Sequence, residues 1–167
     1  MVFAGLASGV IVDRVAVVVG DKIITQSEIE QRIRLTALQN HEKPDFSAET
    51  RRKTAEQLID QKLVEREMEV GRYPRIDEDH KKALLADFEK SEPGLAQMLK
   101  SYGLTAQDLE DDLGRQADLL TFLNLRFRPA VQVTDQDALS NQLADKELDR
   151  WLQDQRKRTR IEYRGAK

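Results

Sequence analysis

The residues that could carry chemistry begin with an acidic group, 77–80, which reads Asp-Glu-Asp-His. Carboxylates together with an imidazole are ligands that zinc accepts. Adjacent residues of a helix point in different directions, however, and acidic residues in a first helical turn are favoured by the helix dipole. Because no second ligand group of fixed spacing occurs in the sequence, we expect a helix start here and no metal site. His41 is expected in a solvated loop.

A second acidic group consists of Asp108, Asp111 and Asp112, which could supply paired carboxylates for acid–base catalysis. Asp111 and Asp112 diverge around a helix, and the sequence shows no apolar pocket that would separate their pKa values. We therefore expect these carboxylates on a charged, exposed face. Residues 20–22, Gly-Asp-Lys, lack the further glycines of a phosphate-binding loop, and no Gly-x-Ser-x-Gly pattern occurs. The sequence supports no catalytic residue.

The composition excludes several classes of protein. Charged residues make up 34% of the chain, aromatic residues 5%, and the net charge is −3, which gives no basic footprint for nucleic acid. No apolar run reaches the roughly 18 residues of a membrane span, and the lack of cysteine excludes a disulfide framework. We expect no nucleic-acid partner, no integral membrane segment and no cofactor. The one basic run, 156–160, is expected to place favourable positive charge at the C-terminal end of a helix and to protect a strand edge against aggregation.

Two segments at opposite ends of the chain have the composition of strands. Most residues of 10–19 are β-branched, Gly20-Asp21 then predicts a tight turn, and Ile23-Ile24 continues the run briefly. At the far end, apolar and charged residues alternate over 159–164. Because one strand is not stable alone, we expect the two ends to pair. The residues expected to make this pairing are Val15, Val17, Val19, Ile161 and Tyr163.

The chain between these strands predicts helices. The helical segments are expected at 25–39, from Ser47 to about Gly71, from Asp77 to about Ser91, from Pro93 to Tyr102, from Thr105 to Arg128, and from Thr134 through Leu152. The fifth should bury a face through Leu109, Leu113, Ala117 and Leu120, and Trp151 should anchor the last helix onto the layer of the first strand. The expected fold is mainly α, a bundle of about six helices with a short two-stranded sheet.

Both ends of the chain resemble one family. Residues 12–29, VDRVAVVVGDKIITQSEI, look like the opening strand and helix of SurA-type periplasmic chaperones. Residues 151–163, WLQDQRKRTRIEY, are similar to the closing helix and strand of that family, and 56–64, EQLIDQKLV, resemble its Leu-Ile-Asp helix. The resemblance implies that the last strand returns to complete the N-terminal domain.

In that family a parvulin prolyl-isomerase domain usually lies before the closing helix and strand. Here only residues 129–145 occupy that place, too few for an independently folded domain. The resemblance to the family implies that a parvulin active site would be a pocket that carries histidine. The two histidines of this chain, His41 and His80, both lie before residue 129, where such a domain would be inserted. We therefore expect no isomerase activity and no enzyme.

The expected organisation is one domain with a leader. Residues 1–9 fit the end of a secretory signal, an added leader or an extension of the first strand, and the sequence leaves these readings open. Residues 10–128 form the SurA-like N-terminal chaperone region, 129–145 the link, and 146–167 the closing helix and strand of the same domain.

The resemblance implies an ATP-independent holdase of the Gram-negative periplasm, whose clients are unfolded exported proteins, outer-membrane proteins above all. The candidate client-binding residues are large apolar side chains that could equally belong to the core: Met68, Phe88, Met98, Tyr102, Phe122 and Phe127. The alternative is a non-catalytic assembly module. In that case the closing helix and strand would swap into a second copy, and the homodimer would serve one dedicated partner.

Overall fold

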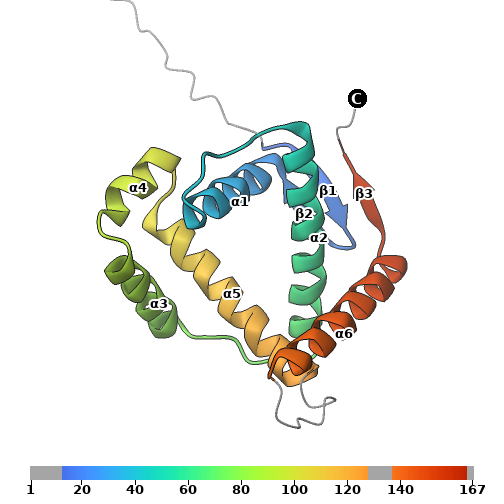
Figure 1. Cartoon of the computed structure of the whole chain (residues 1–167). Helices are drawn as coiled ribbons and strands as arrows, with labels where there is room; N and C mark the ends of the chain where they lie inside the picture. Colours follow the sequence, from blue (N-terminus) through green and yellow to red (C-terminus); the bar gives the residue numbers. More distant parts are fainter. Residues whose placement is uncertain (1–12, 128–136, 165–167) are drawn as a thin grey trace, which may run out of the picture.

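The structure, a computed structural model, describes residues 13–127 and 137–164, with the side chains of 137–143 left out of the description. It confirms a mainly α fold whose sheet contains both terminal strands (Figure 1). The elements are β1 (Val15–Val19), β2 (Lys22–Thr25), α1 (Gln26–Gln39), α2 (Ala48–Val70), α3 (Glu78–Ser91), α4 (Leu95–Tyr102), α5 (Ala106–Arg126), α6 (Asp137–Arg158) and β3 (Ile161–Tyr163). Within the described ranges, no helix has the length and apolarity needed to cross a membrane.

The sheet has three antiparallel strands in the order β2-β1-β3, one more than the two expected. The extra strand is the segment around Ile23, which folds back on β1 instead of continuing it. Gly20 has a φ of +61°, in the left-handed region that glycine adopts readily, so the two-residue turn closes a hairpin. Val17 pairs with Tyr163 and Val19 with Ile161, so four of the five residues expected in the pairing of the two ends take part in it. Val15 pairs instead with Thr25 of β2.

Local capping signals fix where most helices begin. The side chains of Thr25, Ser47, Asp77 and Thr105 each accept a hydrogen bond from a backbone N–H in the first turn of the helix that follows. Residues 77–80 thus begin α3, as predicted. α4 begins at Leu95, later than the expected start at Pro93. Gly94 between them has a φ of +88°, a left-handed conformation that is not helical. The start of the last helix expected at Thr134 lies outside the described residues.

Three apolar clusters hold the elements together. The first packs the sheet against α1 and α2, and the second packs α1 against α4 and the start of α5. The third joins α2, α5 and α6 around Phe122. Trp151 belongs to this third cluster, where its ring lies 5.7 Å from that of Phe122. The expectation that Trp151 anchors α6 on the strand layer is therefore wrong, and its neighbour Leu152 packs against both the first and the third cluster.

The apolar face expected for α5 is correct at its start, where Leu109 is fully buried, but not at its end. Leu120, expected in the core, is 60% exposed, whereas Asp112 and Asp118 are buried. The reason is tertiary, because α1 supplies polar partners to one side of α5 while α3 covers another. Figure 1 shows α3 and α4 beside α5, and the sheet beside α2. α6 contacts α2.

Candidate functional site

A buried carboxylate lies between α1 and α5. Asp112 is fully buried, and its Oδ1 accepts a hydrogen bond of 2.6 Å from Arg32 Nη1. Its Oδ2 accepts bonds from Gln116 Nε2 at 2.8 Å and Gln39 Nε2 at 3.0 Å. The expected exposed position of Asp112 is therefore wrong. Burial is tolerated because both oxygens are satisfied by donors, two of which are cations, Arg32 and, at 3.4 Å from Oδ1, Arg115.

Arg32 extends this group to α2. Its Nη2 donates to Gln61 Oε1 at 2.5 Å, and Gln61 Nε2 in turn donates to Glu65 Oε1 at 2.7 Å. Burial lowers the pKa of the Arg32 guanidinium from its ordinary value, and the charge of Asp112 opposes that shift. Arginine stays protonated in proteins, and Arg32 forms a salt bridge of 2.6 Å with Asp112. Arg32 thus ties three helices together through polar contacts.

The other two aspartates of this acidic group have separate roles. Asp108 caps the start of α5 and accepts a hydrogen bond of 2.5 Å from Gln31 Nε2. Asp111 accepts one of 3.0 Å from Gln107 Nε2, one turn earlier on the same helix. Each of the three carboxylates thus accepts from its own set of donors, as carboxylates that stabilise a fold do.

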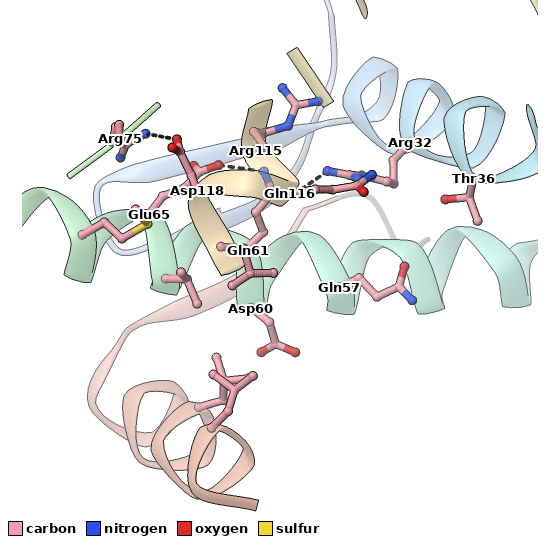
Figure 2. Close-up of a pocket in the computed structure, with 15 residues that line it drawn as sticks. Arg32, Thr36, Gln57, Asp60, Gln61, Glu65, Arg75, Arg115, Gln116 and Asp118 are labelled. Carbon is pink, nitrogen blue, oxygen red and sulfur yellow. Dashed lines mark hydrogen bonds and ion pairs between the residues drawn. The ribbon is translucent and has the colours of Figure 1, made fainter. Parts of the chain in front are cut away.

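Beside the Arg32–Asp112 pair is a cavity of about 350 Å³ (Figure 2). Its walls come from α1, α2, α5, α6 and the loop after α2. The apolar part of the lining consists of Val64, Met68, Leu119, Leu148 and Leu152. The polar part consists of Arg32, Thr36, Gln57, Asp60, Gln61, Glu65, Arg75, Arg115, Gln116 and Asp118. One side of the cavity is therefore apolar and the other is rich in hydrogen-bonding groups.

The carboxylates of the lining are all held by donors. Asp60 accepts a bond of 2.6 Å from Arg156 Nε, and Asp118 accepts one of 2.8 Å from the backbone N–H of Ile76. Glu65 is bound by Gln61. Each of these lining carboxylates thus already accepts a hydrogen bond from another group of the chain.

One wall of the cavity, α6, is held against α2 by a cluster around Arg156. Besides Asp60, Arg156 binds the carboxylate of Glu56 at 2.7 Å through Nη1 and its carbonyl oxygen at 2.9 Å through Nη2. The Tyr163 hydroxyl donates to the other oxygen of Glu56. The hydrogen bond to Asp60 is the main cause that raises the pKa of Arg156. These contacts position Leu148 and Leu152 in the cavity wall.

The structure separates the six candidate client-binding residues into two groups. Met68, Phe122 and Phe127 are buried in the third apolar cluster. Phe88, Met98 and Tyr102 lie partly buried around the second cluster, where the Tyr102 hydroxyl donates to the Glu42 carbonyl at 2.7 Å. Of the six, only Met68 lines the cavity. Sequence reasoning missed the other lining residues, because they come from helices far apart in the chain.

Comparisons with known proteins assign no family to the chain. Neither the protein-family models nor the curated proteins compared with it give a match. The resemblance of residues 12–29 and 151–163 to SurA-type chaperones therefore stays a prediction.

Proposed function

We propose that this protein is an ATP-independent chaperone, which binds extended apolar segments of unfolded polypeptides in the cavity between α1, α2, α5 and α6. The observation that carries the proposal is the cavity itself, with a volume of about 350 Å³ and an apolar wall on three helices. Ligand sites in proteins have volumes from about 300 Å³ upward. A dry cavity of about 150 Å³ accepts benzene, so this one has room for one or two large side chains of a client.

The polar side of the cavity supports binding of many sequences. Gln57 and Gln116 are exposed at the cavity, and their amide groups can both donate to and accept from a peptide backbone. Backbone contacts and apolar area do not depend on one particular sequence. Binding of this kind is broad, weak and reversible, as a holdase requires.

The strand edges offer a second contact for an extended client. β2 and β3 are the outer strands of the sheet, and Ile23 and Tyr163 are 50% and 53% exposed. An extended segment can add to such an edge by β-augmentation. Arg164 and Glu162, an ion pair of 2.6 Å on the closing strand segment, place charge on that edge and so oppose uncontrolled aggregation.

Client class and compartment follow from the resemblance of the two chain ends to SurA-type chaperones. On that basis we propose that the protein acts in a Gram-negative periplasm on unfolded outer-membrane proteins. The proposed activity is holding alone, without prolyl isomerisation and without a cofactor.

Aggregation of a urea-unfolded outer-membrane β-barrel protein after dilution tests the proposal. Without nucleotide, near-stoichiometric protein should suppress the light scattering of the client. Leu119→Lys, which places a charge in the apolar wall, should lose this activity, whereas Leu120→Lys on the exposed face of α5 should keep it. Undiminished scattering in the presence of folded wild-type protein would reject the chaperone function.

A domain-swapped assembly module is the second candidate. The favouring observation is that α6 and β3 dock through discrete contacts, the Arg156 cluster and the β1–β3 pairing, all of which another copy could provide. Sedimentation over a range of concentrations separates the two candidates. A monomer at all concentrations agrees with the chaperone, whereas a stable dimer without holdase activity favours the assembly module.

A further inference from the structure

α3 is less deeply buried than the helices around it. Among α1 to α5, whose side chains the structure describes in full, α3 alone contains no buried residue. Its partly buried residues are Lys81, Leu85 and Phe88, which form one stripe along the helix. Figure 1 shows α3 on the outer side of α5, which is its main neighbour. A helix of 14 residues with only this stripe in contact has little buried apolar area to hold it in place.

Polar contacts do not compensate for this shallow burial. Lys81 binds Glu78 at 2.6 Å and Lys90 binds Asp87 at 2.8 Å, both within α3. In the part of the chain that the structure describes, no hydrogen bond or ion pair joins an α3 side chain to another helix. α6, by contrast, is tied to α2 through Arg156. Elements with few buried contacts are the ones that open at the lowest cost in free energy, so α3 should open before its neighbours.

The surface beneath α3 is apolar. Leu85 and Phe88 pack against the second apolar cluster, which includes the buried side chains of Leu99 on α4 and Leu109 on α5. Leu113 of α5 packs against the same cluster and is partly buried. None of these residues lines the cavity of about 350 Å³. Movement of α3 away from α5 therefore uncovers a separate apolar face.

The two ends of α3 lie next to points that are held. Two residues before α3, the backbone N–H of Ile76 donates to Asp118 of α5 at 2.8 Å. Directly after α3, Glu92 pairs with His41 at 3.3 Å. Gly94 follows with a φ of +88°, and glycine adopts many backbone conformations at little cost. α3 can therefore leave α5 through changes at its ends while the segments on either side stay in place.

We propose that α3 is a lid, and that the face beneath it on α4 and α5 is a second binding surface for apolar segments of unfolded polypeptides. The bound segment takes the place of α3 and supplies what α3 supplies, two large apolar side chains spaced like Leu85 and Phe88. The cavity and this face then hold two segments of one client, which binds more tightly than through either site alone. The inference rests on the proposed function and adds a second, separable site to it.

Hydrogen exchange of the full-length wild-type protein, followed by mass spectrometry, measures the opening of the lid. Amides of α3 should exchange at least about tenfold faster than those in the middle of α2 and α5. Amides of α3 that are as well protected as those of α5 would overturn the lid.

A disulfide between α3 and α5 tests whether client binding needs this opening. A Cβ at Gly114 of α5 would lie 3.1 Å from Lys81 Cγ. Cysteines at these two positions therefore meet the distance of about 3.5–4.5 Å between Cβ atoms that a disulfide requires. The chain has no other cysteine. In the aggregation assay, oxidised Lys81→Cys/Gly114→Cys should be needed at about three times the concentration of the same protein after reduction. Wild-type protein should respond to neither oxidant nor reductant.

A variant that loosens the lid should act in the opposite direction. Phe88→Ser removes part of the contact between α3 and the second cluster, so it should suppress client aggregation at a lower concentration than wild type does. Leu84→Ser is the matched control, because Leu84 lies on the same helix and is 36% exposed. It should behave like wild type.

The outcomes separate this inference from the proposed function. A disulfide-locked protein as active as its reduced form, or a Phe88→Ser variant no more active than Leu84→Ser, would overturn the second surface and leave the cavity as the binding site. If folded wild-type protein suppresses no aggregation at all, both the inference and the proposed function fail.

Discussion

Asp112 and Arg32 show how a charged pair can shape a helical interior. The carboxylate is fully buried, and its donors come from α1 and from its own helix. Such a pair adds little net stability compared with apolar packing, but leaving one partner alone is costly. Its main effect here is geometric, because it fixes the distance between α1 and α5 beside the cavity.

Asp112→Ala should therefore destabilise the protein strongly. Removing one partner of a buried pair costs about 3–5 kcal/mol, and since Arg32 is 18% exposed we expect a loss of about 2–4 kcal/mol in the free energy of unfolding. Urea denaturation followed by circular dichroism measures this loss. The matched control is Asp111→Ala, the adjacent residue on the same helix, with an expected change below about 1 kcal/mol. Similar losses in both variants would contradict the structural role of Asp112.

Sequence reasoning could not place Asp112 for a physical reason. The helical pattern of α5 shows Leu109, Leu113 and Leu120 as its apolar face, and a charged residue between them reads as exposed. The partners that make its burial possible, Arg32 and Gln39, lie 80 and 73 residues earlier in the chain on another helix. Only the tertiary contact reveals them.

At the level of elements, the docking of α6 and β3 depends on Glu56. Burial by itself raises the pKa of this carboxyl, but the hydrogen bonds from Tyr163 and Arg156 and the charge of Arg156 outweigh burial and lower the pKa below its ordinary value of 4.5. A carboxyl whose pKa is lowered by folding stabilises the folded state above its unfolded pKa. This contribution disappears as the pH falls through the lower, folded value.

Acid should therefore weaken the docking of the closing elements. As the pH drops below about 4.5, the urea midpoint of the wild-type protein should fall. Glu56→Gln should be less stable at neutral pH and should lose less on acidification, since it lacks this titrating group. Glu49→Gln, a change at an exposed ion pair on the same helix, should follow the wild-type profile more closely. Parallel acid profiles of wild type and Glu56→Gln would rule out the assigned role.

Most elements could be predicted because their signals are local. The caps Thr25, Ser47, Asp77 and Thr105 act on backbone groups within one turn, so composition and spacing reveal them. The pairing of the two chain ends also follows from strand composition. The sequence does not predict β2 as a separate strand, because a short apolar segment after a glycine turn can equally well continue the first strand.

The cavity is a property of the whole molecule. Its apolar wall combines Val64 and Met68 of α2, Leu119 of α5, and Leu148 and Leu152 of α6. Each of these residues, viewed on its own helix, is an ordinary core position. Because the space between helices depends on how all of them pack, a single helical pattern gives no sign of it, and the aromatic and methionine residues chosen from the sequence mostly fill the core instead.

Site-specific crosslinking of an unfolded client measures directly whether the cavity holds polypeptide. The chain contains no cysteine, so one introduced thiol carries a benzophenone label at a single known place. Gln57→Cys lies at the cavity on α2, and Lys82→Cys is an exposed control on α3 outside the cavity lining. After illumination with a urea-diluted outer-membrane β-barrel protein, the yield of crosslinked client should be several times higher from position 57 than from 82. Equal yields, or a higher yield from 82, would contradict binding in the cavity.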